Sequence, residues 1–208
     1  MVGVKEIIRE YKDLNLIDKI YILLRWRLCP FKLIEKNTPK EGLIVDLGCG
    51  YGILCNLLSL RSKNRNVIGF DLSHKRISIA KKSQNKNKKM RFLEEDLTKR
   101  SVKKTNVIIM TDFLHHIKYE EQNKLISKLK NKLNKRGKLI ILDINKDKKI
   151  KYLFTVLLDR TLNYGEKVYY RNENEIKRML EKNGFQVKSL MVDKLLPMPD
   201  ILFIATKK

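Results

Sequence analysis

Short apolar runs separated by amphipathic stretches are the main pattern of this 208-residue chain. Runs of four or five apolar residues between polar and glycine-containing segments are typical of buried parallel strands. Five of them are Leu43–Leu47, Val67–Phe70, Met90–Leu93, Val107–Met110 and Leu139–Leu142. The spacing between them predicts helices over Ile53–Leu60, His74–Ser83 and Glu120–Leu133. Because strand and helix alternate, the pattern predicts an α/β fold with a doubly wound sheet.

The alternation changes after the fifth predicted strand. We expect a helical insertion near Ile150–Leu162, then a helix over Asn172–Asn183 that Gly184 closes, and finally a hairpin of two strands, Phe185–Val192 and Ile201–Thr206. Ahead of the first strand, Leu16–Leu28 predicts an apolar helix. This helix and the insertion could cap an active site, or they could only cover the sheet.

The length and the 43% hydrophobic content predict one domain with a substantial core. Within it we expect an N-terminal helical cap (1–40), a cofactor-binding core (43–145), a helical lid (146–172) and a C-terminal helix with the strand hairpin (173–208). The start of the chain lacks a signal-peptide pattern and no run of 18 apolar residues occurs, so we expect a cytoplasmic protein. Its three cysteines form no CxxC pair, which indicates reduced thiols.

The net charge of +23 would draw the protein toward nucleic acid or an anionic membrane surface. A compositional bias is an equal alternative, because lysine, asparagine and isoleucine are abundant together along the whole chain. Lysine-rich runs such as residues 81–89 contain no aromatic residues on which bases could stack. Nucleic acid is therefore the less favoured partner.

A glycine-rich segment, Asp46–Gly52, follows the first predicted strand and is here called the glycine loop. Its glycines stand at alternate positions, Gly48, Gly50 and Gly52, where the backbone must turn sharply and approach a ligand closely. Cys49 between them serves as a small filler. The spacing differs from the GxGxxG of dinucleotide-binding loops, and Asp46 would repel a pyrophosphate. A carboxylate there suits a cationic amino acid group, which favours S-adenosylmethionine over a dinucleotide.

Two more acids follow the next two predicted strands, at the strand ends where an open α/β sheet binds its ligand. Asp71 could accept hydrogen bonds from both ribose hydroxyls, and Asp96 could accept one from an adenine amine. Either acid alone could equally be a helix cap or a solvated loop residue. Together with Asp46, three acids in register favour an adenosyl amino acid as the ligand.

On these residues and on the segment Asp112–His116, the chain from Leu43 onward resembles class I S-adenosylmethionine-dependent methyltransferases of the small-molecule type. The resemblance implies a Rossmann-like sheet of seven strands, of which the last is antiparallel. It also implies that Asp71 binds ribose, that Asp96 and Leu97 hold adenine, and that the glycine loop and Asp112 border the methionine part. The implied cofactor-binding residues are Asp46, Gly48, Cys49, Gly50, Gly52, Asp71, Leu72, Asp96, Leu97, Thr111 and Asp112.

The segment after the fourth strand bears on the reaction. It lacks the proline pair of enzymes that methylate exocyclic or amide nitrogens, and it has no cysteine nucleophile for pyrimidine carbon. His115 could instead take a proton from an acceptor hydroxyl, with His116 as the second candidate, or the pair could only shape the site. Asp112, Asp143 and Asn145 offer hard oxygen ligands, but their spacing does not match the metal-using enzymes, so we expect no metal.

Aromatic residues gather in the predicted lid. They would suit a lid over an apolar acceptor that can also carry a negative charge, or they could equally be the core packing of a surface helix. They are Tyr152, Phe154, Tyr164, Tyr169 and Tyr170, with Arg160 and Arg171 nearby. The leading hypothesis is methyl transfer to an oxygen, with carbon as the second choice, of a small hydrophobic or lipid-like molecule at or near an anionic membrane surface. The alternatives are an RNA methyltransferase and a non-catalytic Rossmann-like binding module.

Overall fold

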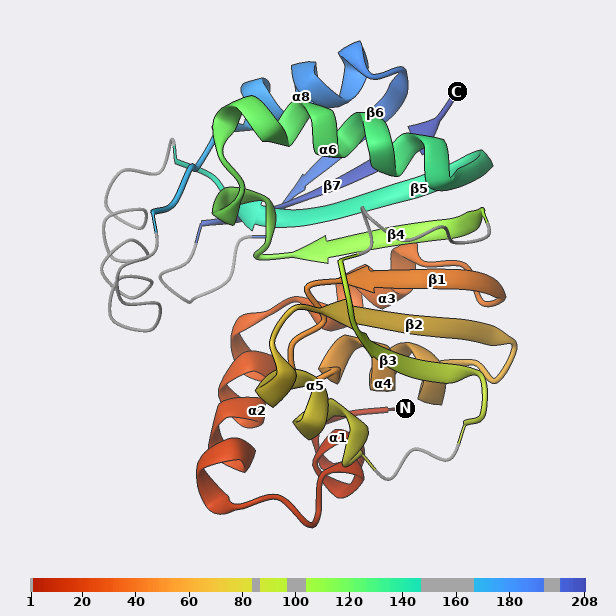
Figure 1. Ribbon diagram of the computed structural model, residues 1–208, viewed down its shortest axis with the longest axis vertical. Helices are drawn as coiled ribbons and strands as arrows, with labels where there is room; N and C mark the ends of the chain where they lie inside the picture. Colours follow the sequence, from red (N-terminus) through yellow and green to blue (C-terminus); the bar gives the residue numbers. More distant parts are fainter. Residues whose placement is uncertain (1, 84–86, 97–103, 147–166, 193–198) are drawn as a thin grey trace. The chain divides into compact units, whose positions relative to one another are not determined.

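The computed structural model describes the chain apart from residues 1, 84–86, 97–103, 147–166 and 193–198. The predicted insertion Ile150–Leu162 therefore lies outside the described residues. Within the described part, the strands are β1 (Gly42–Leu47), β2 (Arg65–Asp71), β3 (Met90–Glu94), β4 (Thr105–Thr111), β5 (Leu133–Ile144), β6 (Phe185–Met191) and β7 (Asp200–Lys207). They form one seven-stranded sheet in the order β3-β2-β1-β4-β5-β7-β6, with β7 antiparallel to β5 and β6 (Figure 1). The predicted Rossmann-like sheet with an antiparallel last strand is confirmed.

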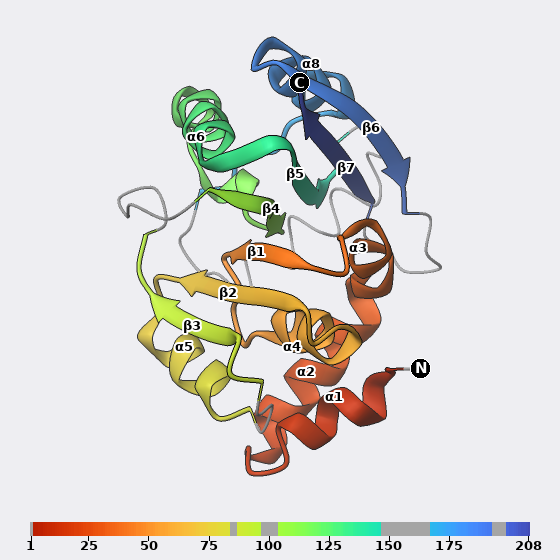
Figure 2. The ribbon, with the colours of Figure 1, turned by 90° about the vertical axis from the view of Figure 1, so that its right-hand side faces the viewer.

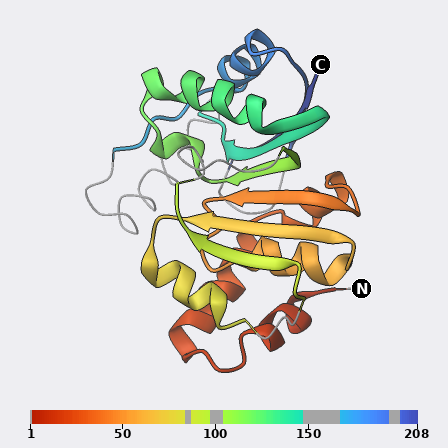
Figure 3. The same ribbon diagram turned by 45° about the vertical axis from the view of Figure 1, so that its right-hand side comes forward.

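The chain divides into two compact units, Met1–Ile109 and Met110–Lys208. In the first, β1 runs parallel to β2 and β2 runs parallel to β3, as Figure 3 shows. Helix α4 (Ile53–Arg61) follows β1, and helix α5 (His74–Lys81) follows β2. Because parallel strands end at the same edge of a sheet, the segments that follow β1, β2 and β3 all begin at one edge.

Three helices precede β1 in the first unit: α1 (Val4–Glu10), α2 (Leu16–Leu28) and α3 (Phe31–Asn37). Helix α2 has the predicted bounds, and the Asn15 side chain caps it by accepting a hydrogen bond from the Asp18 amide at 2.8 Å. None of the helices among the described residues combines the length and the hydropathy needed to cross a bilayer.

A buried arginine ties α3 to β2. Arg65 has no exposed surface, and its guanidinium donates to a Glu35 carboxylate oxygen at 3.0 Å and to the Thr38 carbonyl oxygen at 2.9 Å. It also donates to the Pro39 carbonyl oxygen at 2.7 Å. These charge-assisted bonds satisfy a cation that would otherwise be expensive to bury.

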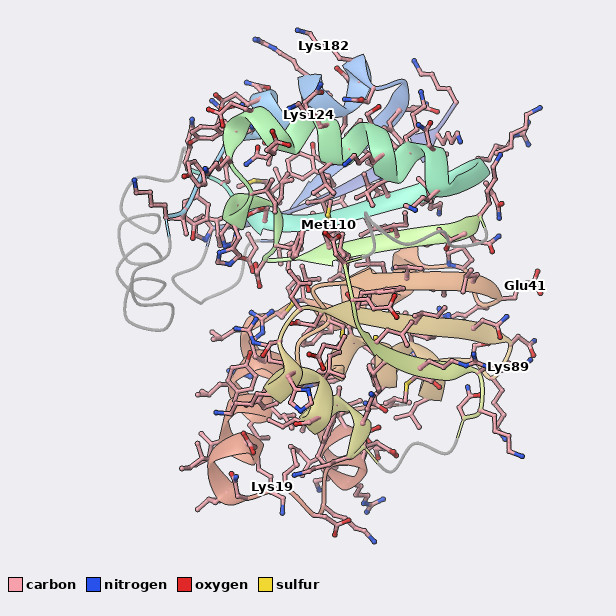
Figure 4. The ribbon with its side chains drawn as sticks, in the orientation of Figure 1. Lys19, Glu41, Lys89, Met110, Lys124 and Lys182 are labelled. Carbon is pink, nitrogen blue, oxygen red and sulfur yellow. The ribbon has the colours of Figure 1, made fainter. Side chains whose placement is uncertain are left out.

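The second unit contains a short 3₁₀ helix, η1 (Leu114–His116), and helices α6 (Tyr119–Lys132) and α8 (Glu173–Lys182). Figure 2 shows β6 and β7 as neighbouring strands that run in opposite directions, which confirms the predicted hairpin. Helix α8 begins at a reciprocal capping box between Asn172 and Glu175, and Gly184 follows it with a φ of 77°. The labelled Lys124 and Lys182 extend from α6 and α8 away from the strands (Figure 4).

Candidate functional site

The glycine loop turns directly from β1 into α4. Gly48, Gly50 and Gly52 all have positive φ, at 77°, 53° and 74°. The amides of Gly48 and Cys49 both donate to the Phe70 carbonyl oxygen, at 2.8 and 2.9 Å, so the loop is fixed to the end of β2. The alternate glycines are therefore required by the backbone, because residues with side chains rarely adopt this conformation.

Gly50 and Gly52 differ in what surrounds them. A Cβ atom on Gly52 would lie 2.5 Å from the Phe92 ring, whereas a Cβ atom on Gly50 would meet nothing within 4 Å. Gly52 thus permits close packing of α4 against β3. The space beside Gly50 is open. A ligand that approaches the loop backbone closely would need such a space.

This difference gives a first prediction. Gly50→Ala and Gly52→Ala both place a side chain at positive φ, but only Gly52→Ala adds a clash in the core. We expect Gly52→Ala to lower the free energy of unfolding by about 3 kcal/mol or more, and Gly50→Ala to lower it by about 1 kcal/mol. Gly50→Ala should instead weaken S-adenosylhomocysteine binding. Denaturant unfolding and calorimetry measure both; equal losses of stability in the two variants would contradict the assignment.

Asp46 is the buried carboxylate at the end of β1, with 1% of its surface exposed. One of its oxygens, Oδ2, accepts a hydrogen bond from the Cys55 thiol at 3.4 Å. The other, Oδ1, is buried and has no hydrogen-bond partner among the described residues. Burial, with a smaller contribution from the nearby Asp71 charge, raises the pKa of this carboxyl to about 7, although the Cys55 hydrogen bond and Arg25 oppose the rise. A cation placed against Oδ1 would satisfy the oxygen and favour its ionised form.

Asp71 ends β2 and organises the backbone around it. Its Oδ2 accepts from the Gly50 amide and its Oδ1 from the Ser73 amide, both at 2.9 Å. A carboxylate has about four acceptor positions, so these bonds leave capacity for ribose hydroxyls. The neighbouring Leu72 exposes 73% of its surface, an apolar contact that suits a base. Asp96 lies half-buried after β3, and Leu97 lies outside the described residues.

Tyr51, which sequence reasoning did not single out, joins the glycine loop to the N-terminal helices. Its hydroxyl donates to Asp18 on α2 at 2.9 Å, and its ring lies 4.5 Å from the Tyr21 ring. Its carbonyl oxygen accepts from the hydroxyl of the fully buried Tyr11 at 2.5 Å, and Asn56 donates to that same hydroxyl at 2.7 Å. Helices α1 and α2 thus brace the loop.

In the second unit, His115 and Asp143 form a buried pair. The His115 Nδ1 lies 2.6 Å from Asp143 Oδ1, and both side chains are 3% exposed. With Nδ1 donating to the carboxylate, the lone pair of the ring is on Nε2. The Asp143 carboxylate also accepts from the Ile144 amide at 2.8 Å, which fixes its orientation. The pair has the chemistry of an oriented general base.

Aromatic residues pack around this pair. The centroids of the Tyr170 and His116 rings lie 4.5 and 4.3 Å from the centroid of the His115 ring. The Tyr169 amide donates to the His115 carbonyl oxygen at 2.7 Å, and the Tyr119 hydroxyl donates to the Tyr170 carbonyl oxygen at 2.8 Å. Residues 169 and 170, at the end of the predicted lid, are therefore anchored on η1 and α6.

A buried glutamine braces the same region. The Gln122 side-chain amide donates to the carbonyl oxygens of Leu114, Ile117 and Tyr169, at 3.2, 2.9 and 3.1 Å. Its oxygen accepts from Arg171 Nε at 2.6 Å, and the Arg171 guanidinium stacks 4.8 Å from the centre of the Tyr119 ring. Sequence reasoning missed Gln122, because one polar residue on an amphipathic helix carries no signal of its contacts.

Other predicted residues are placed as follows. Thr111 is buried at the end of β4, and Asp112 follows it with a φ of 51°, a conformation that an aspartate adopts only where its surroundings fix it. The metal alternative involved Asp143, which the structure pairs with His115; among the described residues no group of three or more potential metal ligands gathers. Tyr152, Phe154, Tyr164 and Arg160 lie outside the described residues.

Comparisons with known proteins bear on the family and the fold of this chain. A family model described as a methyltransferase domain matches residues 25–190. YqeM of Bacillus subtilis (strain 168), named as a methyltransferase, is 29% identical over 128 residues, which are 59% of this chain and 50% of that protein. An uncharacterized methyltransferase of Bacillus cytotoxicus is 29% identical over 164 residues, 75% of this chain and 76% of that protein. The chain thus spans half the length of the first relative and about three quarters of the second.

A solved structure has the same fold. Magnesium protoporphyrin IX methyltransferase from Synechocystis PCC 6803, crystallised with bound S-adenosylhomocysteine, has a TM-score of 0.67 and 23% identity to this chain. The likeness covers 94% of this chain and 89% of that one.

Proposed function

Because the chain belongs to the class I S-adenosylmethionine-dependent methyltransferase family, we propose that it transfers a methyl group to an oxygen of a small, apolar acceptor. The observation that carries this proposal is the buried His115–Asp143 pair. An oriented imidazole is needed to deprotonate a hydroxyl, whereas an acceptor that is already nucleophilic needs only to be positioned.

The residues of the first unit fit the family's cofactor. The Asp46 Oδ1 atom lacks a hydrogen-bond partner among the described residues and would receive the cofactor's ammonium group. Gly50 leaves room for close approach, Asp71 retains acceptor positions for ribose, and Leu72 offers an apolar surface for adenine. The bound cofactor supplies an electrophilic methyl group on a sulfonium.

His115 acts in this proposal as the proton acceptor. Asp143 holds its Nδ1–H, so that Nε2 takes the proton of the acceptor hydroxyl while the new carbon–oxygen bond forms. The Asp143 carboxylate then stabilises the resulting imidazolium across 2.6 Å in a buried setting, where such an interaction is strong. The bonds to Tyr169 and Gln122 keep the η1 backbone in place during this step.

The apolar nature of the acceptor is supported by the aromatic rings around His115 and by one comparison. The Tyr170 ring packs against His115, the Tyr119 ring packs edge-on against Tyr169, and the Arg171 cation lies over the Tyr119 ring. The structural neighbour acts, by its name, on magnesium protoporphyrin IX. An apolar hydroxyl compound is accordingly the acceptor class to test.

The direct experiment measures S-adenosylhomocysteine release with three kinds of acceptor: long-chain phenols, long-chain carboxylic acids and an RNA transcript. We expect turnover with an apolar phenol and none with RNA. Because a carboxylic acid is already ionised at neutral pH, turnover with the acid alone would contradict the need for His115 as the base. Turnover with RNA alone, with an affinity that falls steeply as salt rises, would replace this proposal by RNA methylation, for which the charge of +23 is the argument. Failure of calorimetry to detect cofactor binding would leave only a non-catalytic binding module.

A further inference from the structure

Helix α2 presents a row of apolar side chains to solvent. The exposed fractions are 72% for Leu16, 79% for Ile17, 47% for Ile20, 44% for Leu23 and 55% for Leu24. Single exposed leucines are ordinary on protein surfaces, but a continuous apolar patch on one helix marks a surface that binds something.

The patch lies on the side of α2 that faces away from the glycine loop. At 100° per residue, positions 16, 17, 20, 23 and 24 share one arc of the helix, and Arg27 extends it by a turn. The other side carries the contacts to the first unit: Ile22 is fully buried, Asp18 accepts from the Tyr51 hydroxyl, and the Tyr21 ring packs on Tyr51. The exposed arc is therefore not the part of α2 that braces the cofactor loop.

The charges on and beside α2 are mainly positive. The helix carries Lys19, Arg25 and Arg27 against a single acid, Asp18, which is the hydrogen-bond acceptor of Tyr51. Asp18 and Arg25 both lie on the inner side, where Arg25 interacts with the buried Asp46, so Lys19 and Arg27 are the cations of α2 beside the arc. Two further exposed lysines, Lys12 and Lys32, flank the helix on either side, and the segment before it also contains one exposed acid, residue 13. No acidic residue of α2 shares the arc with the exposed leucines and isoleucines, so the patch combines an apolar face with a mainly basic surround.

We propose that α2 docks this protein on an anionic lipid surface, with the apolar arc entering the boundary between headgroups and acyl chains. Apolar residues surrounded by cations are what an interfacial helix needs. The thirteen residues of α2 span about 20 Å, which suits a helix lying in the membrane surface. Charge complementarity favours lipid over a second copy of the chain, because two molecules of net charge +23 repel each other.

This docking would bring the enzyme to its acceptor, because an apolar acceptor partitions into the same lipid surface that the helix binds. That link rests on the proposed function. The docking itself requires neither cofactor nor acceptor. A vesicle-binding experiment without either one therefore tests it separately from methyl transfer.

The experiment measures flotation of the full chain with vesicles of phosphatidylcholine alone or mixed with phosphatidylglycerol. The double variant Ile17→Ser with Leu24→Ser removes two side chains from the arc. Its matched control is Met191→Ser, which removes a side chain with 47% exposure on β6. We expect the wild-type chain to bind the anionic vesicles preferentially, the double variant to bind them about tenfold or more weakly, and the control to lose less than about twofold.

A charge variant tests whether cations beside the arc contribute to binding of anionic lipid. Arg27→Gln should weaken binding to anionic vesicles about fivefold at low salt, with the difference disappearing near 1 M salt, while Lys182→Gln on α8 should change binding less. Thermal unfolding and S-adenosylhomocysteine calorimetry establish that each variant is folded. Three outcomes would overturn the proposal: equal binding to neutral and anionic vesicles, an equal loss in the Met191→Ser control, or a wild-type dimer in sedimentation that the double variant dissociates. The last would assign the arc to a second copy.

Discussion

Replacing His115 with alanine is expected to lower kcat on the apolar acceptor by about 100-fold to 10,000-fold and to leave the cofactor Kd unchanged within about twofold. The imidazole is paired with Asp143 in the second unit, whereas the predicted cofactor contacts to Asp46, Gly50 and Asp71 come from the first. Removing the ring thus removes the proton acceptor and leaves those contacts in place. Single-turnover kinetics with saturating cofactor, together with calorimetry, separate the two effects.

Two further variants make this test specific. Asp143→Asn preserves the size of the side chain but removes the charge that stabilises the imidazolium, so kcat should also fall by about tenfold or more. His116→Ala removes a neighbouring ring 4.3 Å away and should change kcat little. Because His115 is buried, a thermal melt must show that its variant remains folded, and His115→Gln serves as a less disruptive replacement. Unchanged turnover in both His115 variants would remove this residue from the mechanism, and a large loss in His116→Ala would move the role to His116.

Replacing Asp46 with asparagine is expected to raise the Kd for S-adenosylmethionine by about 10-fold to 100-fold. A charge-assisted hydrogen bond to a buried carboxylate contributes about 1.5–3 kcal/mol, and asparagine keeps the shape while removing the charge. Asp71→Asn is a suitable comparison, because that carboxylate also accepts bonds from Gly50 and Ser73, so its loss should also disturb the loop. Calorimetry at pH 8 measures both variants. A Kd within twofold of wild type for Asp46→Asn would rule out the predicted ammonium contact.

The same carboxylate predicts how affinity and stability depend on pH. With its pKa raised to about 7 by burial, Asp46 is mostly protonated below that pH, so cofactor affinity in the wild-type protein should fall about tenfold for each pH unit below 7. The folded state also binds this proton more tightly than the unfolded chain, whose Asp pKa is about 4. The Asp46 contribution therefore favours folding below about pH 4 and is lost as the pH rises to 7, at most about 4 kcal/mol.

Asp46→Asn should abolish the pH dependence of cofactor affinity and the Asp46 contribution to the pH dependence of stability. At pH 8 the variant should be at least as stable as the wild type to denaturant, although it binds the cofactor less tightly. Unfolding at several pH values between 4 and 8 checks the stability, and calorimetry over the same range checks the affinity. A wild-type affinity that does not change between pH 8 and pH 6 would show that Asp46 is ionised throughout and has no part in this linkage.

The sequence by itself determined the fold class and the cofactor because both follow from local patterns. Continuous apolar runs such as Leu43–Leu47 have the length of buried strands, and the actual β1, Gly42–Leu47, differs by one residue. The alternate glycines and Asp46 lie within seven consecutive residues, so the order of residues alone indicates their chemistry. The Rossmann-like sheet, the family and S-adenosylmethionine as its cofactor are confirmed. The individual contacts of Asp71, Asp96 and His115 with cofactor or acceptor stay predictions.

Only the tertiary structure decided which distant residues meet. Asp143 lies 28 residues from His115, and the sequence indicated it only within a metal alternative that the spacing disfavoured. Spacing alone cannot show that η1 and the end of β5 bring an imidazole and a carboxylate to 2.6 Å. The burial of Arg65 and the link from Tyr11 to Tyr51 were likewise hidden, since each depends on partners 26 to 40 residues away. The exposed arc of α2 was hidden for the same reason: its leucines and isoleucines have the composition of a core helix, and only packing determines which of them are buried.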